Sequence, residues 1–114
     1  MVDAAGITSV RWSPDGHHLA VSSWDGTLRV VHAADGVEVD AFRLSGPVLC
    51  AEWAHGWVAA GTAGAGVVLC DPTSGSRSLL GHHDAPVSAV GPLPGSALVY
   101  SASWDATLAL WDPR

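Results

Sequence analysis

Similar segments recur along this chain at intervals of about 40 residues. The segment SWDGTLRV, which begins at Ser23, returns 80 positions later as SWDATLAL, which begins at Ser103. The apolar stretch Ile7–Trp12 has counterparts at Val48–Trp53 and Val87–Val90, which follow at intervals of 41 and 39 residues. A chain with such a period forms one structural unit per repeat, and each unit buries its apolar surface against its neighbours.

Each unit reads as several short β-strands. Alternating and β-branched residues, together with turn signals such as Ser13–Gly16 and Asp25-Gly26, favour strands, and no segment keeps a helical period for ten residues. Four antiparallel strands in about 40 residues are typical of a β-propeller blade. We therefore predict an all-β partial propeller of about three blades. Their expected ranges are 1–45, 46–80 (a degenerate copy) and 81–114 (a blade that lacks its outer strand).

Composition limits the classes of partner. The chain has 114 residues and a net charge of −6, with 11 acidic residues, five arginines and no lysine. Nucleic acids and anionic membranes are bound by clustered cations, so we expect neither as a partner. No apolar run is long enough for a membrane span and the first residues do not resemble a signal peptide, which favours the cytosol or nucleus.

No cofactor or metal site is expected. Cys50 and Cys70 lie 20 residues apart with no C-x-x-C motif, and two buried thiols are the simplest interpretation. The pairs His17-His18 and His82-His83 have no carboxylate or cysteine at a spacing that would complete a metal site. The glycine-rich stretch 61–66 leads into a strand, whereas a dinucleotide-binding loop leads into a helix.

The motifs resemble those of WD-repeat β-propellers. GHHDAPV at the start of the third unit, the two SWD segments and the final WDPR are most similar to the first three blades of the BUB-family mitotic-checkpoint branch, whose near relative is the messenger-RNA export factor of the nuclear pore. The resemblance implies a non-enzymatic scaffold of the nucleus, kinetochore or cytoplasm. Its implied partners are short peptide motifs of checkpoint kinases or of a nucleoporin, bound on the top face of the propeller.

In such blades a buried hydrogen-bond relay joins four side chains, and the resemblance assigns them in the third unit. They are His83, Ser101, Asp105 and Trp111. The indole of the tryptophan needs an acceptor, a hydroxyl accepts and donates, and the second ring nitrogen of the histidine is expected to reach the carboxylate.

Serine, histidine and aspartate also form acyl-transfer triads, but no G-x-S-x-G motif is present and we expect no enzyme. The first unit has Val21 and Val31 at the Ser101 and Trp111 positions, and the second has Gly64 and Cys70 at the Asp105 and Trp111 positions. We expect these two units to depend on apolar packing instead.

Two tryptophans are candidates for peptide binding. Trp24 and Trp104 precede the aspartate of their turns, on the face where the related proteins hold peptides, although ordinary packing between blades is an equally good interpretation. A second function remains open, because Trp111-Asp112-Pro113-Arg114 fits the W-D-x-R pattern of substrate receptors of cullin-based ubiquitin ligases, in which Asp112 and Arg114 would meet the adaptor. Three blades also leave two sheet faces uncovered, so we expect either a fragment of a seven-bladed protein or a chain that self-associates.

Overall fold

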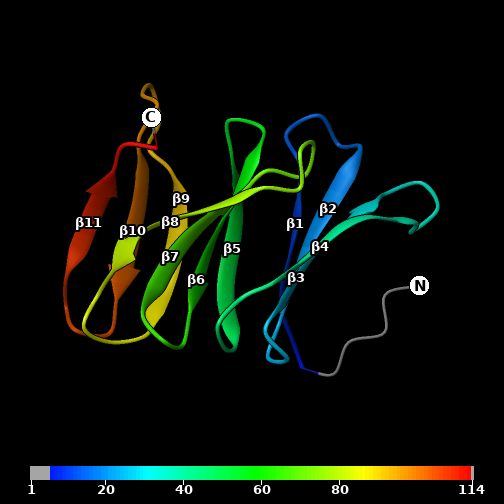
Figure 1. Ribbon diagram of the computed structural model, residues 1–114. Helices are drawn as coiled ribbons and strands as arrows, with labels where there is room; N and C mark the ends of the chain where they lie inside the picture. The colour runs from blue at the N-terminus through cyan, green and yellow to red at the C-terminus, as the bar shows by residue number, and fades with distance from the viewer. Residues whose placement is uncertain (1–5, 114) are drawn as a thin grey trace.

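Residues 6–113 are described by the computed structural model, which contains eleven β-strands in three antiparallel sheets (Figure 1). The first sheet has the order β1-β2-β3-β4, the second β5-β6-β7-β8 and the third β9-β10-β11. The strands are β1 (Ile7–Trp12), β2 (His18–Ser23), β3 (Thr27–His32), β4 (Glu38–Arg43), β5 (Val48–Ala54), β6 (Trp57–Thr62), β7 (Gly66–Cys70), β8 (Arg77–His82), β9 (Val87–Pro92), β10 (Val99–Ser103) and β11 (Leu108–Trp111). Here we call the sheets blades 1, 2 and 3.

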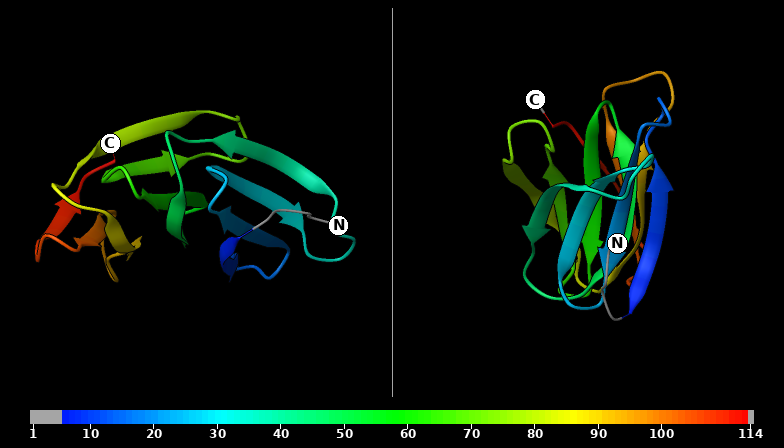
Figure 2. Two further views of the ribbon diagram at one scale, coloured as in Figure 1. Left: turned by 90° about the horizontal axis from the view of Figure 1, so that it is seen from below. Right: turned by 90° about the vertical axis from the view of Figure 1, so that its right-hand side faces the viewer.

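The blades stand side by side along an arc. In the left view of Figure 2 the first strands of the blades, β1, β5 and β9, lie along one side, and the last strands, β4 and β8, lie along the other. Strand β5 contacts β1 on one side and β9 on the other, which makes blade 2 the central unit. The all-β fold predicted from the repeat is therefore confirmed. Strand β8 extends to His82, two residues beyond the range expected for the second unit.

The same turn joins the second and third strands of every blade. Gly26, Ala65 and Ala106 occupy equivalent positions with φ values of 89°, 72° and 70°. At Gly26 a Cβ atom would lie 3.2 Å from the carbonyl oxygen of Gly46, so that turn has little room for a side chain. The shared conformation shows that blade 2 keeps the turn although its sequence has lost the Trp-Asp pair.

Two apolar layers hold the blades together. One lies between blades 1 and 2 and includes Leu28, Val30, Phe42 and Trp53, and the other lies between blades 2 and 3 and includes Val67. Full burial of one such aliphatic side chain contributes about 1.5–3 kcal/mol to the free energy of unfolding. Packing between blades is therefore a main source of stability. Residues 6–113 contain no helix that is long and apolar enough to cross a membrane.

Candidate functional site

The four residues expected to form a relay in blade 3 lie close together. Trp111 on β11 donates its indole Nε1–H to Ser101 Oγ on β10 at 2.7 Å. Ser101 Oγ lies 2.7 Å from Nε2 of His83, which follows β8. The other ring nitrogen of His83, Nδ1, is 3.9 Å from Asp105 Oδ2 in the β10–β11 turn. That separation is too long for a hydrogen bond.

Thr107 completes the relay between His83 and Asp105. Its Oγ1 donates to Asp105 Oδ1 and lies 2.7 Å from His83 Nδ1. Since its only proton goes to the carboxylate, Thr107 accepts from His83 Nδ1–H, and His83 Nε2 accepts the Ser101 proton. The sequence predicts a direct hydrogen bond from His83 to Asp105, and that prediction is wrong because the Thr107 hydroxyl bonds to both groups. The backbone N–H of Thr107 also donates to Asp105 Oδ1, at 2.8 Å, and this tight turn brings the threonine hydroxyl between the two groups.

The carboxylate of Asp105 is held in its ionised form. The hydrogen bond from the Thr107 hydroxyl, and then the one from the backbone N–H of Asp84, lower its pKa from 3.8 to about 2. Hydrogen bonds to the charged form stabilise that form. The carboxylate therefore closes its own turn and ties that turn to the segment that enters β9.

Ser101 cannot serve as an exposed nucleophile. Ser101 is 0% exposed, and its hydroxyl oxygen is already hydrogen-bonded to Trp111 and His83. Trp111 itself lies against Gly81 on β8, where a Cβ atom would collide with the indole ring. The relay thus connects β10, β11 and the end of blade 2. Two further residues contribute to it and were not predicted from the sequence: Gly81, which leaves room for the indole ring, and Thr107, which bonds to His83 and Asp105. The threonine had a detectable signal, because it follows the aspartate by two residues in both SWD segments.

Blades 1 and 2 replace the relay by other contacts. Val21 and Val31 are buried, as is Cys70. In blade 2, where Gly64 takes the place of the turn aspartate, Thr62 Oγ1 accepts the backbone N–H of Gly66 at 3.0 Å. That hydroxyl closes the turn that a carboxylate closes in the other two blades.

Trp24 lies in the β2–β3 turn and Trp104 in the equivalent β10–β11 turn. Both turns are at the lower edge of the molecule in Figure 1. The two tryptophans are 58% and 70% exposed. The backbone N–H of Trp24 donates to Gly6 O at 2.9 Å, and that of Trp104 to Pro86 O at 3.1 Å. The equivalent position between them, in blade 2, is Ala63, so a small side chain lies between two exposed indoles.

The remaining candidates are the two residues of the WDPR segment and the two cysteines. Asp112 is exposed just beyond β11, and Arg114 lies outside the described residues, so the ubiquitin-ligase alternative stays a prediction. Cys50 is partly buried, Cys70 is buried, and neither forms a disulfide. Burial raises the pKa of Cys50 to about 11 and that of Cys70 to about 12, which keeps both as thiols at neutral pH. Within residues 6–113 no group of three histidine, cysteine or acidic side chains is arranged to hold a metal ion.

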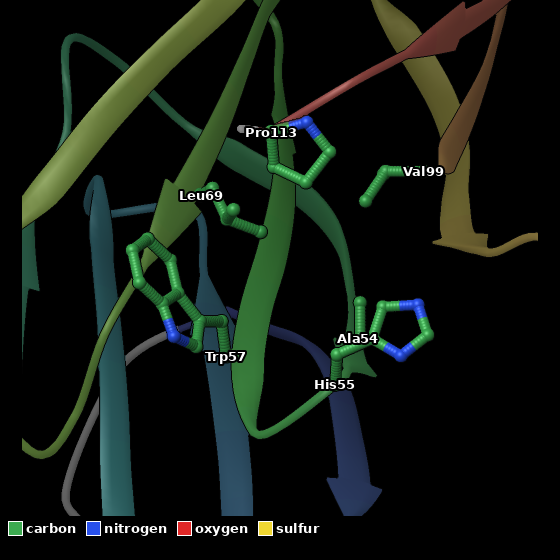
Figure 3. Close-up of a pocket in the computed structure, with 6 residues that line it drawn as sticks. All are labelled: Ala54, His55, Trp57, Leu69, Val99 and Pro113. Carbon is green, nitrogen blue, oxygen red and sulfur yellow. The ribbon is translucent and has the colours of Figure 1, made fainter. Parts of the chain in front are cut away.

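Two of the hollows between neighbouring blades lie on the edge opposite the two tryptophans. Figure 3 shows the hollow between blades 2 and 3, where Leu69 and Trp57 lie on one side, Val99, Ala54 and His55 on the other, and Pro113 at one end. Its volume is about 180 Å³. A second hollow between blades 1 and 2 has a volume of about 530 Å³ and includes Asp15 and His18 in its lining.

Three sheets of this kind, packed through apolar layers and with a buried Trp-Ser-His relay in the third, define a set of β-propeller blades. A family model described as "WD domain, G-beta repeat" matches residues 3–32 and 74–112, and the chain belongs to this WD40 family. Residues 6–113 also superpose on solved propeller domains. The crystal structure of RRP9 WD40 repeats covers 99% of this chain with a TM-score of 0.89 at 18% identity, and this chain covers 37% of that one.

Curated relatives carry names from several processes. The WD40 repeat protein poxJ of Penicillium oxalicum is 31% identical over 95% of this chain and 34% of its own length. The mitotic checkpoint protein bub-3 of Caenorhabditis elegans is 36% identical over 84% of this chain and 29% of its own length. The poly(A)+ RNA export protein of Schizosaccharomyces pombe is 30% identical over 95% of this chain and 33% of its own length. The chain thus spans about a third of the length of the relatives it matches.

Proposed function

We propose that this chain is a non-enzymatic interaction module that binds a short peptide motif along the edge formed by the β2–β3, β6–β7 and β10–β11 turns. Trp24 and Trp104 are its anchors. The partner is a segment of a checkpoint kinase or of a nucleoporin, which corresponds to a role at the kinetochore or in messenger-RNA export. Similarity to relatives named for a mitotic checkpoint and for RNA export supports this assignment.

The observation that carries the proposal is the matched exposure of the two indoles. Large aromatic side chains are usually buried, and exposed tryptophans held on rigid turns are typical anchors of binding energy. Each of these two is fixed through its backbone N–H, and each turn is braced by a serine, with Ser23 Oγ and Ser103 Oγ accepting the N–H of Asp25 and Asp105. An anchor that is already ordered loses little entropy on binding.

The relay in blade 3 has a structural part in this proposal. It fixes the β10–β11 turn that carries Trp104, since Asp105 is bonded both to Thr107 and to the backbone of Asp84. We infer that the relay serves to position this turn and takes no part in a reaction.

The proposal is tested by peptide binding. Fluorescein-labelled peptides from a checkpoint kinase and from a nucleoporin are titrated with the wild-type chain and with Trp24→Ala and Trp104→Ala. Each substitution is expected to weaken binding at least tenfold, because loss of an aromatic anchor costs more than about 1 kcal/mol. Trp12→Ala is the matched control, since Trp12 is 62% exposed on β1 but lies at the opposite end of its blade.

Equal weakening by all three substitutions would point to nonspecific hydrophobic binding and would contradict the proposal. Preference for one of the two peptides would distinguish the checkpoint role from the export role.

A further inference from the structure

The hollow between blades 1 and 2 differs from the hollow between blades 2 and 3 in both size and chemistry. It measures about 530 Å³ against about 180 Å³, and only the larger value falls in the range of about 300–1,000 Å³ that is usual for ligand pockets. At this edge blade 1 has the turn residue Asp15, while the β5–β6 turn of blade 2 has His55. Of these two turns, therefore, only the β1–β2 turn places a carboxylate, that of Asp15, in the lining of the hollow beside it.

The carboxylate is rigidly held and has bonding capacity left. Asp15 Oδ1 accepts the hydroxyl of Ser13 at 2.5 Å and the backbone N–H of His17 at 2.9 Å. No hydrogen bond to Asp15 Oδ2 is present among residues 6–113. The Ser13 hydrogen bond, followed by that of His17, lowers the pKa of Asp15, so the group is an anion at neutral pH.

Aromatic and apolar side chains form the rest of the lining. The ring of His18 lies 5.0 Å from that of His32 and 6.4 Å from that of Trp53, centre to centre. Val39 and Pro72 also line the hollow. Trp53 is fixed in place because its Nε1–H donates to Arg11 O at 3.0 Å. An ionised carboxylate beside aromatic rings is suited to a planar cation, because such a cation can form an ion pair with the carboxylate and stack on a ring.

Charge favours the same kind of ligand. The chain carries a net charge of −6 and no lysine. No arginine is among the described residues that line the hollow, and Arg11 on β1 is paired with Glu52 at 3.4 Å. A guanidinium group has an advantage over an ammonium group here, since it can donate two parallel hydrogen bonds to a carboxylate and stack on an aromatic ring.

From these observations we propose that the hollow between blades 1 and 2 is a binding site for an arginine side chain of a partner peptide, with Asp15 as its counter-ion and His18 and Trp53 as its aromatic wall. This site is separate from the edge that carries Trp24 and Trp104, because the β1–β2 and β2–β3 turns lie at opposite ends of β2. It does not rest on the function proposed above.

The test uses N-acetyl-arginine amide as the probe and nitrogen-15 amide spectra of the full chain as the readout. Saturable shifts are expected at Gly16, His17, Gly56 and Thr73 and at the Trp53 indole N–H. N-acetyl-citrulline amide, which has the same shape but no charge, is expected to bind at least tenfold more weakly.

Asp15→Asn is expected to weaken binding of the arginine probe at least tenfold, because the amide keeps an oxygen for Ser13 and His17 but has no charge. Asp35→Asn is the matched control: Asp35 Oδ1 accepts the backbone N–H of Val37 at 3.0 Å in a similar turn outside the hollow. The control is expected to bind as the wild type does. Equal binding of citrulline, unchanged binding by Asp15→Asn, or shifts spread over other acidic turns would each overturn the proposal.

Discussion

Ser101 is a small residue whose loss is expected to have a large effect. Its buried oxygen accepts from Trp111 and donates to His83, so Ser101→Ala leaves an indole N–H and a ring nitrogen without partners. A buried polar group left unsatisfied costs about 1–3 kcal/mol, and we expect the free energy of unfolding to fall by about that amount. Urea unfolding followed by circular dichroism measures the change.

Ser88→Ala is the control for this substitution. Ser88 is exposed on β9 and donates to Ala102 O at 3.3 Å. Its loss should change stability by less than about 0.5 kcal/mol. If Ser88→Ala lowered the free energy of unfolding as much as Ser101→Ala does, the relay would contribute no more to stability than an ordinary surface hydrogen bond.

Asp105 should make stability depend on pH in the acid range. Its pKa is about 2 in the folded chain against 3.8 for an unperturbed carboxyl, mainly because of the Thr107 hydrogen bond. The folded state therefore binds fewer protons, and its advantage is complete above about pH 4 and is lost as the pH falls towards 2. The difference in unfolding free energy between wild type and Asp105→Asn is expected to be constant near neutral pH and to shrink between about pH 4 and pH 2. A difference that stays constant down to pH 2 would contradict this prediction.

At the scale of the strand, one close approach between blades 2 and 3 depends on a glycine. A Cβ atom at Gly61 on β6 would lie 2.5 Å from Cγ1 of Val87 and 2.7 Å from Sγ of Cys50. Gly61→Ala is therefore expected to destabilise the chain by about 1–3 kcal/mol, as overpacking of a core does. Thermal unfolding measures the shift.

The matched substitution is Gly64→Ala, because the nearest atom to its Cβ is Ser45 O at 3.6 Å, an ordinary contact. The double variant Gly61→Ala/Val87→Ala separates a steric cause from a backbone cause. If crowding is the reason, the second substitution adds less destabilisation than it does in the wild-type background. Purely additive effects would exclude crowding.

The strands were easier to predict than the contacts between them. Alternation and turn residues are local signals: the apolar stretch Ile7–Trp12 is strand β1, and the turns predicted at Ser13–Gly16 and Asp25-Gly26 lie in the β1–β2 and β2–β3 connections. The approach of Gly61 to Val87 joins residues of different sheets, and nothing in either local sequence signals it. Thr107 had a local signal in its spacing from Asp105, but its position between His83 and Asp105 follows from the geometry of the turn.

At the scale of the whole molecule, the far face of blade 3 is uncovered among the described residues. Leu108 and Leu110 on β11 are 69% and 53% exposed, while the equivalent residues of blade 1, Leu28 and Val30, are 0% exposed because blade 2 covers them. The equivalents in blade 2, Val67 and Leu69, are buried against blade 3. This face therefore has the side chains of a blade interface without a neighbouring blade.

An apolar sheet face of this kind promotes association in water. We expect the 114-residue chain to show an average mass that rises with concentration in light scattering. The double substitution Leu108→Glu/Leu110→Glu should shift it towards the monomer, since two charges on each face would have to be desolvated in the contact.

Leu79→Glu is the control for this experiment, because Leu79 is 57% exposed on β8, away from the far face of blade 3. It should leave the association unchanged. A wild-type chain that stays monomeric at every concentration and unfolds in one sharp, reversible transition would show that blade 3 needs no neighbour. The exposed leucines would then be an ordinary part of its surface.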